Sequence, residues 1–404
     1  MILFRRHLVA ALLCAATALP GGEIKLPPIS GKIAGQFRPL KIANTPPLGG
    51  VIEIRPSPDT KGNREIEAQF DGPGTRVRVI GNFSTSEDGT WRIVDGALDL
   101  AAWFPVAVTA SGELMQGMTA TGRIKISGEG EVRAGEPSGT IRLTIENAEL
   151  EHRGGWKLEG VDFTGNFSFG MPGPRVNSTE PFELTVARVT TYRFGARTLQ
   201  IHGGLNEDRS VAVNDASVEI AGGKVSLEGT TLKLIPLVFE STLRIVNVGL
   251  QDVAALVPSG LSESKGRING SVRIGWSSAD GFMLGVGELE LAKTEPATVR
   301  LAPKPGFLTR SLPKKFGPFA NPVYPDMEQI ELGRAPLQVD TLTVKLTPQG
   351  DERGRTASVH MTAHPGKANA GVKALNFDVN VAGPLSEVIN LGLKQKENLS
   401  IETH

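Results

Sequence analysis

The chain has 404 residues, and its 43 basic side chains balance 43 acidic ones, so its formal net charge is zero. This balance argues against nucleic acid as a partner, because binding to phosphates requires an excess of basic side chains. Glycine (48) and proline (27) are abundant, whereas aromatic residues make up 5% and cysteine occurs once. The composition therefore excludes a disulfide-stabilised scaffold and cysteine-rich metal sites.

The first 18 residues predict a secretory signal peptide. Arg5 and Arg6 precede the apolar run LVAALLCA, and an A-x-A pattern follows at residues 16–18. A basic start, a short apolar stretch and a small-residue exit are the three parts of such a signal. We expect export to the periplasm or cell envelope, or anchoring to the inner membrane where the signal is not cleaved.

The rest of the chain indicates strands almost throughout. Residues 19–58 are rich in proline and glycine and indicate a loop-like lead-in with a few short extended pieces. From Val77 onward apolar and polar residues alternate, which is typical of strands with one apolar face. We divide this part into an N-terminal β segment, 59–135, and a larger β domain, 136–404. The alternating apolar sets are Val77 and Val79; Ile124 and Ile126; Ile141, Leu143 and Ile145; Phe182, Leu184 and Val186; Val218 and Ile220; Val225 and Leu227; Leu232 and Leu234; Leu243 and Ile245; Val272 and Ile274; Leu289 and Leu291; Val344 and Leu346; Val359 and Met361; and Phe377, Val379 and Val381.

Turns, helices and one long excursion complete the expected elements. Gly154-Gly155, Gly203-Gly204 and Gly222-Gly223 predict hairpin turns. Helical periodicity is scarce: residues 249–257 form the best candidate, since Leu250, Val253, Ala254 and Val257 share one face, and 386–391 form a weaker one. The proline-rich stretch 302–336 indicates a loop that leaves the sheet.

Two architectures fit so many strands, because open twisted sheets rarely exceed about ten strands without curling or splitting. One is an elongated antiparallel sheet curled into a groove, with one or two short capping helices. The other is a series of β-sandwiches, in which each apolar face packs on a second sheet. Aliphatic side chains cannot stay bare to water, so the apolar face requires either a protein core or an apolar guest.

Several short motifs resemble a known family. Gly139 to Leu143 (GTIRL) opens an alternating strand, and FELTV at 182–186 leads to AGGKV at 221–225. A strand-then-helix step follows at 243–257, then a hairpin at 266–272 (GRINGSV) and a closing segment at 375–393. In the order of these motifs and in their residue patterns, residues 120–404 resemble the YdbH-type "dicarboxylate transport" domain of AsmA-like envelope proteins. These proteins belong to the bridge-like lipid transfer group.

The resemblance implies a periplasmic β-groove, spanning 136–404 with the excursion at 302–336, that conducts phospholipids between inner and outer membranes. Family members are often longer, so a complete bridge, a shuttle and an adaptor all stay open. The expected partners are phospholipid acyl chains, together with inner- and outer-membrane proteins. No cofactor, metal or catalytic residue is expected. The expected lipid-binding residues are Ile141, Leu143, Ile145, Val225, Leu227, Leu243, Ile245, Val272 and Ile274.

Other functions leave weaker traces in the sequence. His360 and His364 could bind zinc on a helix, but in a strand they lie too far apart for one ion, at about 13 Å. An esterase or glycosidase would need a paired nucleophile and base, and no such pair is evident. A structural or adhesive β-sandwich protein that binds protein or glycan partners is the main alternative, and it requires a fully packed core.

The excursion also holds a candidate membrane contact. Arg310, Lys314 and Lys315 lie close to Phe316, and basic side chains beside apolar ones can touch anionic headgroups. The simpler interpretation is a solvated loop with a few packed aromatic rings.

Overall fold

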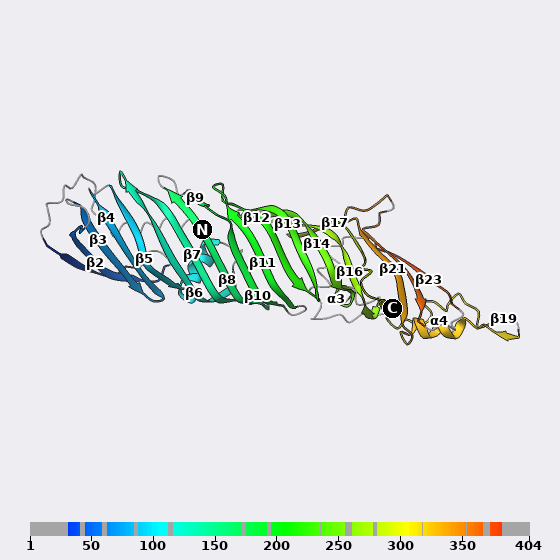
Figure 1. Ribbon diagram of the computed structural model, residues 1–404. Coiled ribbons are helices and arrows are strands. Elements are labelled where there is room, and N and C mark those ends of the chain that lie inside the picture. Colours follow the sequence, from blue (N-terminus) through cyan, green and yellow to red (C-terminus); the bar gives the residue numbers. More distant parts are fainter. Residues whose placement is uncertain are drawn as a thin grey trace. The chain divides into compact units, whose positions relative to one another are not determined.

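The structure is a computed structural model, and its chain divides into two compact units, residues 1–214 and 215–404. It describes residues 31–40, 45–58, 63–84, 88–111, 116–170, 175–191, 195–234, 236–254, 261–277, 281–316, 318–352, 354–366 and 372–381. The predicted signal peptide and the weaker helix candidate at 386–391 lie outside these residues. The two units are described separately below, and Figure 1 labels many of their elements.

The first unit is an antiparallel sheet in which most strands pair with their neighbours in the chain. The exception is β8, which pairs with both β9 and β10. Its strands are β1 (Ile33–Leu40), β2 (Leu48–Pro56), β3 (Arg64–Gly72), β4 (Thr75–Phe83), β5 (Gly89–Asp99), β6 (Met118–Arg133), β7 (Glu136–His152), β8 (Trp156–Gly170), β9 (Arg175–Ser178), β10 (Phe182–Thr190) and β11 (Gly195–Leu205). Strand β12 (Ser210–Ile220) contains the boundary between the units. The lead-in predicted at 19–58 thus contributes two full strands, β1 and β2.

The second unit is also antiparallel. Pairing runs from β13 through β14, β16, β17, β21 and β22 to β23, while β18 pairs with β15 and β21. Its strands are β13 (Gly223–Leu234), β14 (Leu237–Gly249), β15 (Leu261–Lys265), β16 (Arg267–Ser277), β17 (Gly281–Leu291), β18 (Ala297–Leu301), β21 (Leu337–Leu346), β22 (Ala357–Pro365) and β23 (Leu375–Val381). A separate hairpin joins β19 (Lys315–Phe316) to β20 (Phe319–Ala320). This hairpin lies in the 302–336 stretch, between β18 and β21.

The predicted mainly β fold with an open, curled antiparallel sheet is confirmed: every alternating set named above lies in a strand, and these strands pair antiparallel in one sheet that does not close on itself. The alternative of tandem sandwiches is wrong, because all the described strands except the β19–β20 hairpin belong to one sheet. The predicted turn at Gly203-Gly204 is also wrong, since both glycines lie inside β11. A Cβ on Gly203 would come 2.4 Å from the carbonyl oxygen of Ala212, so close backbone approach explains this glycine.

Bulges in neighbouring strands bend the sheet of the first unit. The pairing register shifts at Gly122 in β6 and again around Asn147 in β7. Gly122 faces β7 so closely that a Cβ there would lie 2.8 Å from the Cβ of Ala148. A bulge bends its strand and increases its twist, so neighbouring bulges bend the sheet along a line.

The second unit has a similar bulge. Asn147 and Asn247 both have positive φ, 52° and 53°, at a register shift in a strand. The N–H of Asn147 donates to Oδ1 of Asp162 at 2.7 Å, and the N–H of Asn247 donates to Oδ1 of Asn269 at 2.8 Å. In each unit a side chain of the next strand therefore satisfies the bulged N–H.

Replacing Asn147 by valine is expected to lower the free energy of unfolding by about 1–2 kcal/mol, because a β-branched residue is strained at positive φ. Asn147→Gly relieves this strain and serves as the matched control, so it should cost less than about 1 kcal/mol. Urea denaturation of both variants measures the difference. Equal losses for valine and glycine would contradict the assigned backbone conformation.

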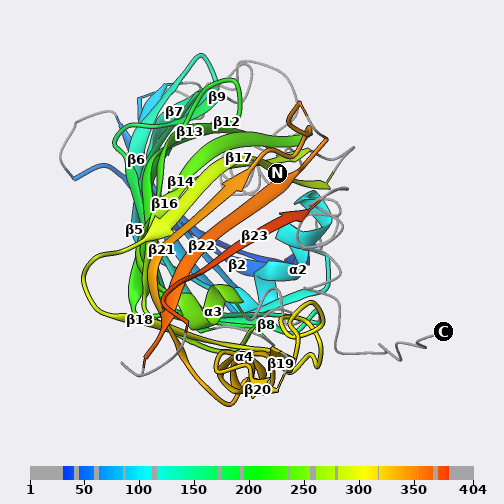
Figure 2. The same ribbon diagram turned by 90° about the vertical axis from the view of Figure 1, so that its right-hand side faces the viewer.

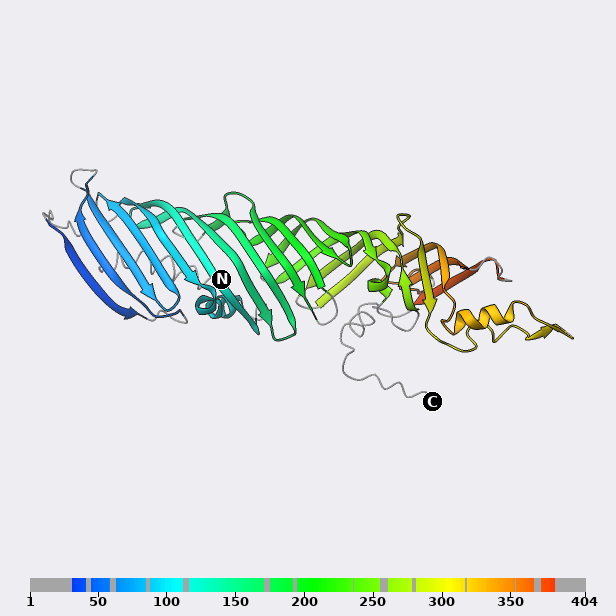
Figure 3. The ribbon, with the colours of Figure 1, turned by 60° about the horizontal axis from the view of Figure 1, so that its bottom comes forward.

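Three helices occur among the described residues: α2 (Leu100–Ser111), α3 (Leu250–Ala254) and α4 (Tyr324–Glu331). The helix predicted at 249–257 is α3, confirmed up to the last described residue. Helix α2 was not expected. It follows β5 directly, and Oδ1 of Asp99 accepts a hydrogen bond from the N–H of Ala101 at 2.8 Å, which caps its start. Figure 3 shows α2 at one end of the neighbouring strands, and Figure 2 shows α3 and α4 near β18.

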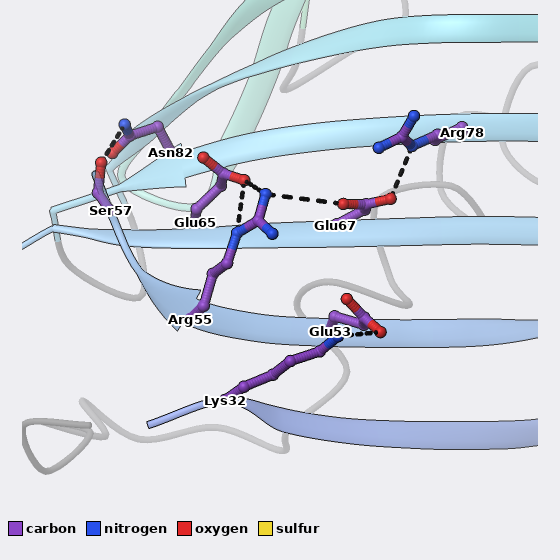
Figure 4. Close-up of polar contacts among 8 residues, drawn as sticks. All are labelled: Lys32, Glu53, Arg55, Ser57, Glu65, Glu67, Arg78 and Asn82. Atoms are coloured by element: carbon purple, nitrogen blue, oxygen red, sulfur yellow. Dashed lines mark hydrogen bonds and ion pairs between the residues drawn. The ribbon is translucent and has the colours of Figure 1, made fainter. Parts of the chain in front are cut away.

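Charged ladders cover the face of the N-terminal strands that points away from the apolar core. Nε of Arg55 donates to Oε1 of Glu65 at 2.9 Å, and Nε of Arg78 donates to Oε1 of Glu67 at 2.6 Å (Figure 4). The hydrogen bond and charge of Arg78 outweigh partial burial and lower the pKa of Glu67 below its usual value. Further contacts of the ladder join Lys32 to Glu53 and Asn82 to Ser57. Such pairs fix strand register more than they add stability.

Candidate functional site

The apolar face of the second unit carries six of the predicted lipid-binding residues. Leu227 of β13 lies opposite Leu243 of β14, which in turn lies opposite Val272 of β16. Val225 lies opposite Ile245 one step along the same two strands. Residues directly opposite in a sheet share a face, as do residues two apart in one strand. These residues therefore form one aliphatic patch over three strands, which Ile274 extends along β16.

Most of this patch is only half-buried. Val272 is 7% exposed and belongs to the core of the unit, and Val225, Ile245 and Ile274 pack against that core. Leu227 and Leu243 are half-buried and lie outside it. Strands β13 and β14 thus present aliphatic side chains that keep part of their surface exposed. Full burial of one such side chain stabilises by about 1.5–3 kcal/mol, so contact between this patch and an apolar guest is favourable.

The other three predicted residues, Ile141, Leu143 and Ile145, line one face of β7 in the first unit. Ile145 belongs to an apolar row that crosses five strands, from β6 to β11. Successive opposite residues in this row are Ile124, Ile145, Phe163, Leu184 and Ile201. All three predicted residues are half-buried and pack against apolar clusters of this unit.

Aromatic rings share this face, which the sequence interpretation missed. Phe163 and Phe167 lie opposite Ile145 and Ile141. The ring centroid of Phe163 lies 6.4 Å from that of Phe167 and 5.7 Å from that of Phe182. The signal was present in the alternation of VDFTGNFSF at 161–169. The first unit is therefore lined by aliphatic and aromatic side chains, and not by aliphatic ones alone.

The opposite face of the second unit is charged. Nε of Arg273 lies 2.6 Å from Oε1 of Glu240, and Nζ of Lys345 lies 3.6 Å from Oε1 of Glu288. These residues border a shallow hollow of about 690 Å³. A charged lining disfavours acyl chains, because ions lose hydration when an apolar guest covers them. The two faces of one sheet therefore differ sharply in what they can bind.

The predicted membrane-contact residues lie between β18 and α4. Arg310, Lys314 and Lys315 are exposed, and β19 contains Lys315 and Phe316. The side chain of Phe316 lies outside the described part of the chain. No predicted lipid-binding residue belongs to this stretch, so the two predicted sites are separate.

The two histidines of β22 do not share a site. Nδ1 of His360 lies 2.7 Å from Oδ1 of Asp378, and Nδ1 of His364 lies 3.0 Å from Oδ2 of Asp340. Among the described residues, no group of three or more His, Cys, Asp or Glu side chains is arranged to hold a metal ion. In the same part of the chain, no helix has both the length and the apolar character needed to cross a membrane.

The sequence matches the model of one protein family. The model described as "YdbH-like: Intermembrane phospholipid transport protein YdbH" matches residues 66–280, more than half of the sequence. The chain belongs to the YdbH-like family. The match covers all nine predicted lipid-binding residues and includes four of the five motifs that suggested the resemblance, and the closing segment at 375–393 lies outside it. Searches of curated proteins and of solved structures gave no match.

The YdbH-like match starts earlier in the chain than the resemblance predicted at 120–404. It takes in β3, β4, β5 and α2 of the first unit as well as β13, β14 and β16 of the second. Family membership supports intermembrane phospholipid transport in general and, with it, a place in the cell envelope.

Proposed function

We propose that this protein binds phospholipid acyl chains on the apolar faces of its two units and moves lipid between the inner and outer membranes. The chains would slide along the aliphatic rows while their headgroups stay at the wet edge. In this proposal the protein is not an enzyme, because movement of a lipid along an apolar surface breaks no bond. Its place is the periplasm, where partner proteins of either membrane can receive the lipid.

One observation carries the proposal: the aliphatic side chains that lie opposite one another on β13 and β14 are only half-buried. An acyl chain contributes about 0.8 kcal/mol for each methylene that it buries. Contact with several opposite residues would therefore retain a lipid without any specific polar contact. No single contact would hold the lipid in one place. The acyl chain could therefore move along the sheet, since each step exchanges one aliphatic contact for a similar one.

Site-specific photocrosslinking tests where lipid lies. A photoreactive phenylalanine analogue replaces Leu227 in the second unit or Leu143 in the first. Matched controls carry it at Arg244 and Arg142, which alternate with these residues toward the opposite face. We expect phospholipid adducts by mass spectrometry at the two leucines alone. Adducts at none of the positions, or equally at all four, would refute the lipid-bearing face.

Charge substitution tests transport. Leu227→Glu or Ile245→Glu places a carboxylate on the patch, and we expect at least about a tenfold loss of lipid transfer between donor and acceptor vesicles, since a charge is poorly tolerated beside acyl chains. Thr242→Glu is the control, because Thr242 lies opposite Arg273 on the charged face. Unchanged transfer in both patch variants, with folding preserved by circular dichroism, would contradict the proposed path.

A further inference from the structure

A basic segment, residues 302–325, follows β18 and ends as α4 begins. It contains Lys304, Arg310, Lys314 and Lys315 and has no acidic residue. The whole chain is neutral, so four positive charges within 24 residues are a local excess. Clusters of this kind are attracted to anionic lipid headgroups, at about 1 kcal/mol for each basic residue near the surface.

Buried polar groups hold the basic segment in a defined shape. Glu331 of α4 is 3% exposed, and its carboxylate accepts hydrogen bonds from the N–H groups of Gly306, Leu308 and Thr309 at 2.9–3.1 Å. The hydroxyl of Thr309 also donates to it, at 2.8 Å. Asn321, likewise 3% exposed, donates through Nδ2 to the carbonyl oxygen of Pro313 at 2.8 Å. The segment is therefore an ordered element with its own internal framework.

This framework presents aromatic and basic side chains together. Phe319 is 75% exposed and Phe307 is 53% exposed, although large apolar side chains usually avoid water. Nζ of Lys304 lies 5.7 Å from the centre of the Phe307 ring, and Nζ of Lys314 lies 5.3 Å from the centre of the Tyr324 ring. An exposed ring beside an ammonium group matches the boundary between acyl chains and headgroups.

We propose that the basic segment docks this protein on a bilayer surface that carries anionic headgroups. Phe307 and Phe319 enter the boundary of the acyl region, while Lys304, Arg310, Lys314 and Lys315 meet the phosphates. The proposal deepens the proposed function, on which it rests for the presence of a membrane. It adds a second lipid contact, made with a surface and separate from the aliphatic patch of β13 and β14.

Vesicle flotation with the purified full chain tests this docking. The probes are vesicles of phosphatidylcholine alone and vesicles with about a third phosphatidylglycerol. We expect binding to the anionic vesicles only, and at least a tenfold loss of it in 0.5 M salt, because screening shortens the reach of surface charges. The variant Lys314→Gln/Lys315→Gln/Phe319→Ser should bind the anionic vesicles at least about tenfold more weakly.

A matched control removes two lysines and one exposed apolar residue elsewhere in the second unit. Lys233→Gln/Lys265→Gln/Val286→Ser changes two exposed lysines and one apolar side chain that is 61% exposed. It should bind anionic vesicles as the unmodified chain does. Equal loss in both triple variants, or equal binding to neutral vesicles, would overturn the docking site. Photocrosslinking at Leu227 in the docking variant separates the two proposals, since lipid adducts there are expected to persist without vesicle docking.

Discussion

Replacing Trp103 by alanine is expected to lower the free energy of unfolding of the first unit by about 3–5 kcal/mol. Trp103 is 2% exposed and fastens α2 to the core that contains Leu98 and Val77. Its Nε1–H donates to Oγ1 of Thr75 at 2.8 Å, inside the protein. Truncation removes the ring and also leaves the Thr75 hydroxyl without this donor, so both losses add.

Two control variants separate the loss of the buried ring from the loss of the hydrogen bond. Trp103→Phe keeps an aromatic ring but loses the N–H donor, so a smaller cost of about 1–3 kcal/mol is expected. Trp276→Ala removes a tryptophan that is 37% exposed and should cost less than the buried truncation. Chemical denaturation followed by intrinsic fluorescence measures all three. A loss in Trp103→Ala no larger than in Trp276→Ala would contradict the packing of α2 on the sheet.

Acidification is expected to release the basic segment from α4 as the pH falls from about 4.5 toward 2. Burial alone would raise the pKa of Glu331, but hydrogen bonds from Gly306, Leu308 and Thr309 outweigh it and lower the pKa to about 2. A carboxyl group whose folded pKa is lowered contributes stability above its unfolded pKa, near 4.5. That contribution declines below pH 4.5 and is lost as the folded pKa is passed.

The variant Glu331→Gln removes the charge at every pH. We expect a loss of roughly 1–3 kcal/mol at pH 7, because the amide offers one acceptor oxygen to donors that the carboxylate satisfied with two. Amide hydrogen exchange at Gly306, Leu308 and Thr309 reports the local opening. Glu328→Gln, on the same helix, is the control and should leave these amides protected. If Glu331→Gln exchanges no faster than the unmodified chain, the carboxylate does not hold the segment.

Strand alternation made much of this fold predictable. Val225 with Leu227, and Leu243 with Ile245, each stand two apart, so both pairs were expected on one apolar face, and the register places them opposite each other. The same reasoning could not distinguish a curled sheet from a sandwich, because alternation states which side chains are apolar and not what they meet. The bulges at Asn147 and Asn247 were also hidden, since an asparagine inside a strand pattern resembles an ordinary polar position.

Helices α2 and α4 were missed for different reasons. Helix α2 is apolar on nearly all sides and contains Pro105, so it has no helical stripe and includes a residue that interrupts helices. Helix α4 follows several prolines and spans eight residues, too few for a clear period. The importance of Glu331 depends on backbone N–H groups that lie 22 to 25 residues away in the chain. No local pattern signals such a partner.

The pairing order of the first unit allows strands to be inserted or deleted in pairs. From β1 to β8 each strand bonds to the strands next to it in the chain. Stability in such an array accumulates from neighbouring contacts, much as in repeat proteins. Adding or removing a pair of antiparallel strands preserves the alternation of direction and leaves the remaining registers intact. Evolution can therefore lengthen or shorten this apolar surface by whole hairpins.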